Sequence, residues 1–225
     1  MARKKRNNKH LFLLLASILA GYLLLLIFQK KHSNHNTSNL KNNSLGDLSR
    51  TERNAIERTI INYGSSIDFY ANDLKLNPAY FKSLIVLECS GKKEIPPRFE
   101  RRVFEQLKNV RDGKQKHYYN IKKKHIADAS DDALKNLATS WGPFQVMGYQ
   151  VLRMDINIKD LRGPKSIYWG IKWINERYGR KIKKEKYHDA FHIHNTGSPY
   201  PKYGRPRTHN PHYVPNGIKY MQYFQ

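Results

Sequence analysis

The chain is poor in cysteine and in acidic residues. Its 225 residues include one cysteine, Cys89, so no intramolecular disulfide can form and the folded part must be held by its own core. Aspartate and glutamate together number 18 against 41 lysines and arginines, which gives a formal net charge of +23. No internal repeat is visible, and few segments alternate strictly between polar and apolar residues. The length predicts one domain with additional segments, and the scarcity of alternating segments predicts that any β-sheet is small.

One segment near the N-terminus lacks charge altogether. Residues 11–28 form an uncharged apolar stretch of 18 residues, long enough to span a bilayer. Residues 1–10 carry five Lys/Arg, whereas only Lys30 and Lys31 follow the stretch closely. The positive-inside rule then predicts a cytoplasmic basic tail at 1–10 and a single-pass signal-anchor at 11–28 in the inner membrane. A cleaved signal peptide is the alternative, but no small-x-small cleavage site follows the stretch.

The remainder of the chain divides into a linker and a domain. Residues 29–50 are rich in Asn, Ser, Lys and His and predict a flexible linker, which leaves 51–225 as the extracytoplasmic domain. Residues 1–31 hold seven positive charges and no acid, so the rest carries +16. This positive charge favours an anionic partner, either wall polymers or lipid head groups. Nucleic acid fits the predicted topology poorly, and a lysine-rich composition alone is the plain alternative.

Helical periodicity dominates the predicted domain. Apolar positions with helical spacing, or helix-starting residues, predict the following helices: 51–72, 78–90, 130–140, 143–153, one from 163–164 through Tyr178, 185–193 and 214–224. The segment 108–127 carries seven Lys/Arg and is predicted as a surface excursion, and 196–212 is predicted as a loop. The fold class is therefore mainly α.

Glu88 is the residue with the clearest chemical implication. It lies in a helix that Asn77 caps, Pro78 opens and Gly91 ends, and it shares a face with Phe81 and Leu84. A carboxyl buried on such a face loses hydration, which raises its pKa. A general acid that works near neutral pH needs such a carboxyl. The alternative is an exposed Glu at the end of the helix.

Four short segments, the first of which contains Glu88, follow one another in a characteristic order. Residues 88–91 read Glu-Cys-Ser-Gly, 140–148 read Ser-Trp-Gly-Pro-Phe-Gln-Val-Met-Gly, and 194–197 read His-Asn-Thr-Gly. A Phe-Glu-Arg segment at 99–101 follows the glutamate. Over about residues 55–223 this order resembles the lysozyme-like superfamily, in particular lytic transglycosylases and the N-acetylmuramidases of phage endolysins. The resemblance implies a helical domain of the goose-type lysozyme kind.

The resemblance also implies an activity and a set of site residues. The enzyme would cleave the β-1,4 bond between N-acetylmuramic acid and N-acetylglucosamine of peptidoglycan without a cofactor, with Glu88 as general acid and base. The expected roles of the other residues are sugar or carboxylate hydrogen bonding by Gln145 and Asn195, ring stacking by Trp141, Phe144 and Tyr149, and substrate binding or positioning of Glu88 by His194. Core packing is the alternative for the aromatics, and turn capping for Gln145 and Asn195.

The chain departs from the family pattern at two positions. Cys89 replaces the usual Ser, and His194 stands where the third motif normally has a Tyr that positions the acid. Tyr200, Tyr203 and Tyr213 are candidates to supply the missing hydroxyl.

Other function classes remain open. His188, His192 and His194 have a spacing that can bind zinc, although Asp189 stands where a metalloprotease needs Glu, and we expect no metal. Cys89 as a nucleophile and a non-catalytic cationic binding module are further alternatives. Within the glycosidase interpretation, inverting hydrolysis needs a second carboxylate, whereas transglycosylation needs only Glu88. The candidates for that second carboxylate are Glu94, Glu100, Asp128, Asp131 and Asp132.

Overall fold

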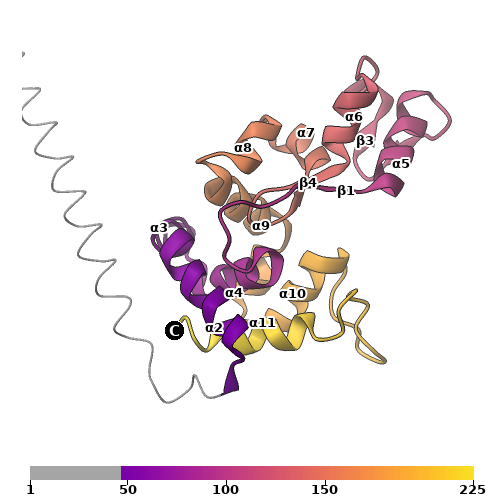
Figure 1. Ribbon diagram of the computed structural model, residues 1–225. Helices are drawn as coiled ribbons and strands as arrows, with labels where there is room; N and C mark the ends of the chain where they lie inside the picture. Colours follow the sequence, from indigo (N-terminus) through magenta and orange to yellow (C-terminus); the bar gives the residue numbers. More distant parts are fainter. Residues whose placement is uncertain (1–46) are drawn as a thin grey trace, which may run out of the picture. The chain divides into compact units, whose positions relative to one another are not determined.

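The computed structural model describes residues 47–225, which are mainly helical as predicted (Figure 1). The α-helices are α2 (Arg50–Thr59), α3 (Ser65–Asp73), α4 (Pro78–Cys89), α5 (Arg101–Arg111), α6 (Asp131–Leu137), α7 (Val151–Met154), α8 (Ile158–Arg162), α9 (Ser166–Lys183), α10 (Tyr187–Thr196) and α11 (Tyr213–Met221). The remaining elements are the π-helix η2 (Ile60–Gly64), the 3-10 turns η3 (Lys123–His125) and η4 (Gly148–Gln150), and the strands β1 (Arg98–Phe99), β2 (His117–Tyr118), β3 (Ile121–Lys122), β4 (Thr139–Trp141) and β5 (Val146–Met147).

The first helical stretch matches the prediction for 51–72. Ser49 caps α2 in a capping box with Glu52, and the helix continues through η2 into α3 without leaving helical geometry. A π-turn inside a helix is uncommon and is frequent at functional sites. Tyr63 lies in this turn and is buried, and its hydroxyl donates a hydrogen bond to the carbonyl of Lys92 at 2.6 Å.

Helix α4 is the centre of the core and matches the prediction for 78–90. Asn77 accepts a hydrogen bond from the backbone of Ala79, and Pro78 occupies the first turn. Ser90 and Gly91 then adopt left-handed conformations that end the helix. A side chain at Gly91 would lie 2.6 Å from the backbone nitrogen of Thr59, so glycine lets α4 end directly against α2. Helix α4 packs against α11, α2 and α3.

The sheets are small, as predicted, but one of them replaces a predicted helix. Strands β1, β4 and β5 form an antiparallel sheet in which Ser140 pairs with Met147 and Trp141 with Val146. The predicted helix 143–153 is therefore wrong in its first half, and only Val151–Met154 is α-helical. Pro143 suits a turn as well as a helix start, and Gly142 (φ +71°) and Gln145 (φ +48°) close a hairpin turn there.

A second part of the fold was only partly predicted. The basic segment 108–127 contains the end of α5 and the hairpin β2–β3, whose turn is formed by Tyr119 and Asn120. Helices α5 and α8 were not predicted. Figure 1 shows α5, α6 and β3 together on one side of the crossing of β1 and β4, away from α4, α10 and α11.

The last helices agree with the prediction apart from their limits. Helix α9 carries a break at Tyr178, whose φ of −149° is not helical. The chain between α10 and α11 forms no helix or strand, as predicted for 196–212.

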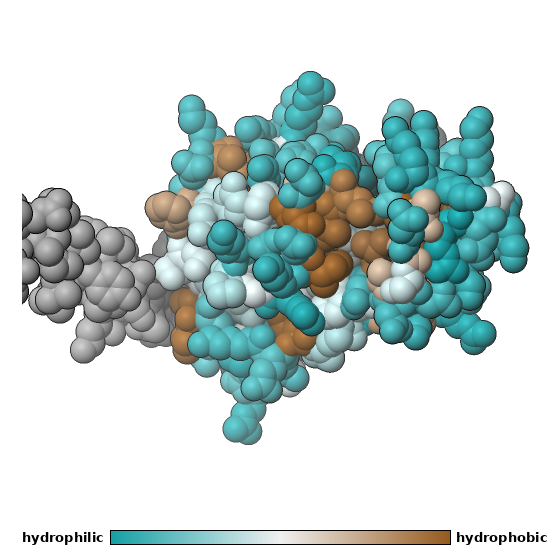
Figure 2. Space-filling view, turned by 90° about the horizontal axis from the view of Figure 1, so that it is seen from above, coloured by the Kyte–Doolittle hydropathy of each residue, from teal (hydrophilic) through white to brown (hydrophobic). Residues whose placement is uncertain are grey.

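Within residues 47–225, none of the helices has the length and apolar character needed to cross a membrane. The predicted basic tail and signal-anchor and most of the predicted linker lie outside the described residues. Figure 2 shows a largely hydrophilic surface on the face seen from above, with a hydrophobic patch near its middle.

Candidate active site

Glu88 lies in the last turn of α4, on a helix whose other side chains are mostly apolar and buried. Its own side chain is 16% exposed, so the carboxyl is largely buried yet reachable from solvent. Burial raises the pKa of Glu88 from 4.5 to about 7, although a hydrogen bond from Tyr213 and the positive charge of Arg98 both act to lower it. The predicted raised pKa is thus present, and its cause is desolvation.

Tyr213 fixes one oxygen of this carboxyl. The residue opens α11, is buried, and donates its hydroxyl hydrogen to Oε1 of Glu88. Of the three tyrosines considered as replacements for the motif tyrosine, Tyr213 alone has a hydrogen bond to Glu88. Tyr203 is 92% exposed, and Tyr200 packs against His188 and His192.

His194 approaches the same carboxyl oxygen of Glu88 as Tyr213 does. Its Nε2 is 3.6 Å from Oε1 of Glu88 and 3.1 Å from the carbonyl oxygen of Phe144. A carbonyl only accepts, so Nε2 carries the hydrogen and Nδ1 is the acceptor. The hydroxyl of Tyr178, 2.6 Å from Nδ1, must therefore donate to it.

The imidazole of His194 is neutral at physiological pH. Burial lowers its pKa from 6.5 to about 4, so the contact with Glu88 is not an ion pair. The hydroxyl of Tyr80 lies 3.4 Å from that of Tyr178 and extends the chain of polar groups behind the histidine. The predicted positioning role of His194 thus has a geometric basis, and a second layer of tyrosines fixes its tautomer.

Gln145 contacts its own hairpin. Its Oε1 accepts from the hydroxyl of Ser140 at 2.8 Å, and its Nε2 donates to the carbonyl of Gly142 at 3.1 Å. The expected position just inside a helix is wrong, because the residue closes the β4–β5 turn. The second hydrogen on Nε2 remains available to a ligand.

The three aromatic residues predicted to stack on sugars differ in exposure. Phe144 is 1% exposed and packs edge-on against Phe81, so the prediction that it offers a face to a sugar is wrong. Trp141 is 8% exposed, donates to the carbonyl of Asn136, and has the guanidinium of Arg162 over its ring at 5.0 Å. Tyr149 stacks on Tyr119 with ring centroids 5.9 Å apart.

Asn195 lies near the end of α10 with an exposed side chain. Its neighbour Thr196 hydrogen-bonds the carbonyl of His192 and helps to end the helix before Gly197. Asn195 is therefore in a position to contact a ligand from the surface, one residue beyond His194.

A groove of about 580 Å³ borders the chain that leaves Glu88. Its walls come from η2, the segment after α4, the β4–β5 turn and the start of α9, and they include Tyr63, Lys93, Trp141 and Arg162. The groove thus combines an aromatic edge with two cations.

Two of the three clustered histidines, His192 and His194, are already engaged in hydrogen bonds. His192 accepts from the backbone N–H of Arg207 at Nε2, so its Nδ1 carries the hydrogen and donates to the carbonyl of Ser198 at 2.7 Å. His194 likewise uses both nitrogens. Among residues 47–225 no group of three His, Cys, Asp or Glu side chains is arranged to hold a metal ion.

Cys89 is a partly buried thiol. Desolvation raises its pKa to about 11, and its Sγ donates to the carbonyl of Ile85 at 3.3 Å. A thiol in this state is a poor nucleophile at neutral pH.

Several candidates for a second carboxylate are occupied elsewhere. Asp131 pairs with Lys108 and Arg111, and Asp132 pairs with Lys135. Glu100 pairs at 2.8 Å with Arg98, the same arginine whose charge lowers the pKa of Glu88. Of the five candidates, Glu100 alone is linked to Glu88 through a shared residue.

Comparisons of the chain with protein-family models, with curated proteins and with solved structures find no match. Sequence reasoning did not find Tyr80, Tyr178 or Arg98 as parts of the site. For Tyr178 a usable signal existed, because it falls on the predicted apolar stripe of α9 as its only hydroxyl-bearing member.

Proposed function

We propose that the protein cleaves the glycan strands of peptidoglycan at the β-1,4 bond between N-acetylmuramic acid and N-acetylglucosamine, with Glu88 as the general acid and then the general base. One observation carries the proposal. The carboxyl of Glu88 has a pKa of about 7 and is anchored through Oε1 only, since no hydrogen bond from residues 47–225 reaches Oε2. An acid with this pKa is about half protonated at neutral pH and can give its proton to a leaving glycosidic oxygen.

The surrounding groups support this role. Proton transfer from Oε2 to the leaving oxygen creates a carboxylate, which the hydroxyl of Tyr213 and the charge of Arg98 stabilise. The neutral His194, whose Nε2 hydrogen is donated to the carbonyl of Phe144, lies 3.6 Å from Oε1 and adds no full charge that would lower the pKa of Glu88 further. The carboxylate then accepts a proton from the attacking nucleophile, which restores the acid.

The nucleophile distinguishes two outcomes. Water gives hydrolysis with a reducing end, whereas the 6-hydroxyl of the muramic acid gives an anhydro end. Glu100 is the candidate to activate water because it pairs with Arg98. An anhydro product needs no second carboxylate.

The lysozyme-like fold and the location belong to the same proposal. A mainly helical domain with a small antiparallel sheet beside the acid suits a lysozyme-like enzyme. Residues 11–28 would anchor it in the inner membrane with the domain on the extracytoplasmic side, where its positive charge meets anionic wall polymers or lipid head groups. Protection of the N-terminus and cleavage of the domain by an external protease would support this topology, and the opposite pattern would contradict it.

The decisive experiment compares full-length wild type with Glu88→Gln on purified peptidoglycan, followed by mass spectrometry of the released fragments. Loss of general-acid catalysis typically lowers the rate by about 10²–10⁴-fold. Glu57→Gln, which changes an exposed glutamate on α2, is the matched control and should cleave like wild type. Full activity of Glu88→Gln would refute the mechanism. Binding without cleavage by wild type would instead favour a cationic binding module.

A further inference from the structure

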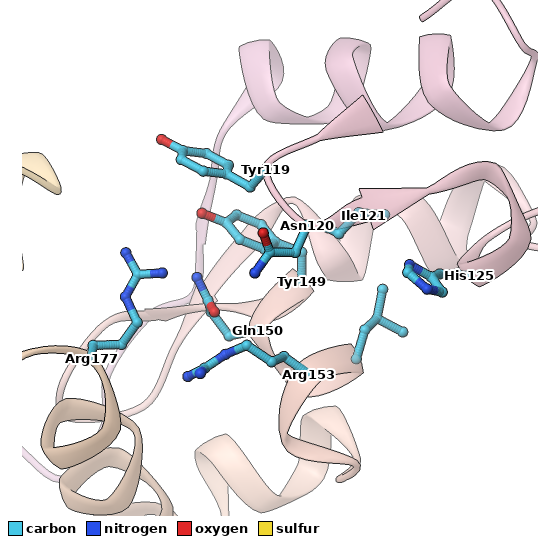
Figure 3. A pocket seen from close by; sticks show the side chains of 9 residues that line it. Tyr119, Asn120, Ile121, His125, Tyr149, Gln150, Arg153 and Arg177 are labelled. Carbon is cyan, nitrogen blue, oxygen red and sulfur yellow. The ribbon is translucent and has the colours of Figure 1, made fainter. Parts of the chain in front are cut away.

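A second cavity lies apart from Glu88, between the β2–β3 hairpin, the η4–α7 segment and the middle of α9. Its volume is about 170 Å³, against about 580 Å³ for the groove beside Trp141. Figure 3 shows its walls, with Tyr119 and Tyr149 stacked above and the guanidinium groups of Arg153 and Arg177 on one side. The cavity therefore suits a smaller group than the groove does.

The charge in this cavity is only partly balanced. Arg153 is 3.3 Å from a carboxylate oxygen of Glu176, which compensates it in part. Arg177 is exposed, and in the described part of the chain no carboxylate lies within ion-pair distance of it. A guanidinium without a partner at the edge of a cavity is a ready site for a carboxylate, which it can bind in a bidentate manner.

The rest of the lining adds amide groups and apolar surface. Asn120 and Gln150 line the same cavity, and Figure 3 places both amides toward the side of the arginines. Ile121 and Leu152 supply an aliphatic surface, and the ring of Tyr119 is 63% exposed at the rim. Cations, amides and an apolar surface together match a short acidic peptide better than a bare phosphate, which needs no apolar contact.

The cavity is joined to the candidate acid by adjacent residues. Arg177 precedes Tyr178, the residue whose hydroxyl donates to His194 beside Glu88. Arg177 lines the cavity, whereas Tyr178, where α9 is broken, is buried at 4% exposure and contacts His194. A ligand that binds Arg177 in the cavity would thus contact the residue next to Tyr178, whose hydroxyl holds His194 beside Glu88.

We propose that this cavity binds a carboxylate of the peptide stem that is attached to the glycan strand, with Arg177 as the principal contact. The identity of the peptide rests on the proposed function, because a peptidoglycan-cleaving enzyme meets such stems on its substrate. The binding chemistry itself, an acidic peptide on Arg177, rests on the cavity.

The test measures binding of a synthetic stem peptide, L-Ala–γ-D-Glu–L-Lys–D-Ala, to the full-length Glu88→Gln protein by calorimetry. Loss of a charge-assisted hydrogen bond should weaken binding at least about tenfold in Arg177→Ala, and Arg177→Lys should recover only part of it. The matched control is Arg180→Ala, which removes an exposed arginine of the same helix that does not line the cavity. It should bind like its parent.

Three results would overturn the proposal: no binding of the peptide at millimolar concentration, equal losses for Arg177→Ala and Arg180→Ala, or displacement of the peptide by a glycerol-phosphate oligomer at lower concentration than by a second acidic peptide. The last result would assign the cavity to a phosphate polymer. Cleavage of peptidoglycan by wild type without peptide binding would leave the proposed function intact. Peptide binding without cleavage would refute the proposed function alone.

Discussion

The hydroxyl of Tyr213 donates a hydrogen bond to Oε1 of Glu88 across 125 positions of the chain. This contact joins the start of α11 to the end of α4 and leaves the second carboxyl oxygen without a protein partner among residues 47–225. It also opposes the desolvation that raises the pKa of Glu88, so the pKa of about 7 reflects a balance of burial against hydrogen bonding.

Tyr213→Phe should move that balance. A hydrogen bond to a charged group contributes about 1.5–3 kcal/mol, which corresponds to roughly one to two pH units. Without it, the pKa of Glu88 should rise and the alkaline limb of the pH–rate profile should move to higher pH by about that amount. The matched control is Tyr220→Phe, because Tyr220 lies on the same helix and donates to Glu52 at 3.0 Å. An unchanged pH–rate profile in Tyr213→Phe would show that the hydroxyl of Tyr213 does not affect the pKa of Glu88.

Glu88→Gln should change how stability depends on pH. The folded-state pKa of Glu88 is raised from 4.5 to about 7, so below about pH 4.5 both states are protonated and no penalty exists. As the pH rises from 4.5 through 7, the unfolded carboxyl ionises first and folding loses stability. The variant lacks this loss, so its advantage over wild type in unfolding free energy should grow by about 3 kcal/mol between pH 4 and pH 8.

Urea denaturation at the two pH values measures this difference. Glu57→Gln serves as the control and should show no comparable trend, since Glu57 is exposed. A constant difference between Glu88→Gln and wild type would mean that the carboxyl ionises normally in the folded state.

His194→Gln should change the pH dependence of stability on the acidic side, whereas Glu88→Gln changes it toward higher pH. The pKa of His194 is lowered from 6.5 to about 4, so its stabilising effect is complete above pH 6.5 and is lost as the pH falls through 4. Wild type should therefore lose about 3 kcal/mol more than His194→Gln between pH 7 and pH 4. Thermal denaturation across this range tests it, with the exposed His209→Gln as control. Parallel curves for wild type and His194→Gln would show that the pKa of the imidazole is the same in the folded and unfolded chain, so that burial does not lower it.

Gly170→Ala should destabilise the domain although alanine is the better helix former. A Cβ at this position would lie 2.1 Å from Cδ2 of Phe144, the residue whose carbonyl accepts from His194. Overpacking of this kind costs about 1–3 kcal/mol, more than the gain of about 1 kcal/mol from helix propensity. Gly64→Ala has room, since its nearest neighbour is 3.8 Å away, and should stabilise slightly in the same denaturation assay. Equal effects of the two substitutions would contradict the close packing of Phe144.

The sequence predicted the helices better than the turns. Helix α4 was correct at both ends because Asn77, Pro78 and Gly91 are local signals that act within a few residues. The helix expected from Pro143 was wrong because proline also suits a hairpin turn, and pairing with β1 decides between the two. Pairing over 42 positions, as between Arg98 and Ser140, leaves no local trace in the chain.

In the candidate site, too, the features with a local sequence signal were predicted and those that depend on long-range packing were not. Glu88 was found because a carboxylate in an apolar helix stands out locally, and its burial followed from the helix face. The partners of Glu88 come from α10 and α11, and which tyrosine reaches it depends on how these helices pack. Phe144 was misassigned for the same reason, because its residue type suits a sugar platform and a core position equally.

The separation of Glu88 and Tyr213 along the chain has a consequence for biosynthesis. Translation proceeds from the N-terminus, so the ribosome produces Glu88 125 residues before the tyrosine that completes its environment. Helix α4 is likewise made long before α11, which covers it. A nascent chain that has not passed position 213 therefore lacks the arrangement that we assign to catalysis. Glu88 therefore gains the hydrogen bond from Tyr213 only after α11 has been synthesised and has packed against α4.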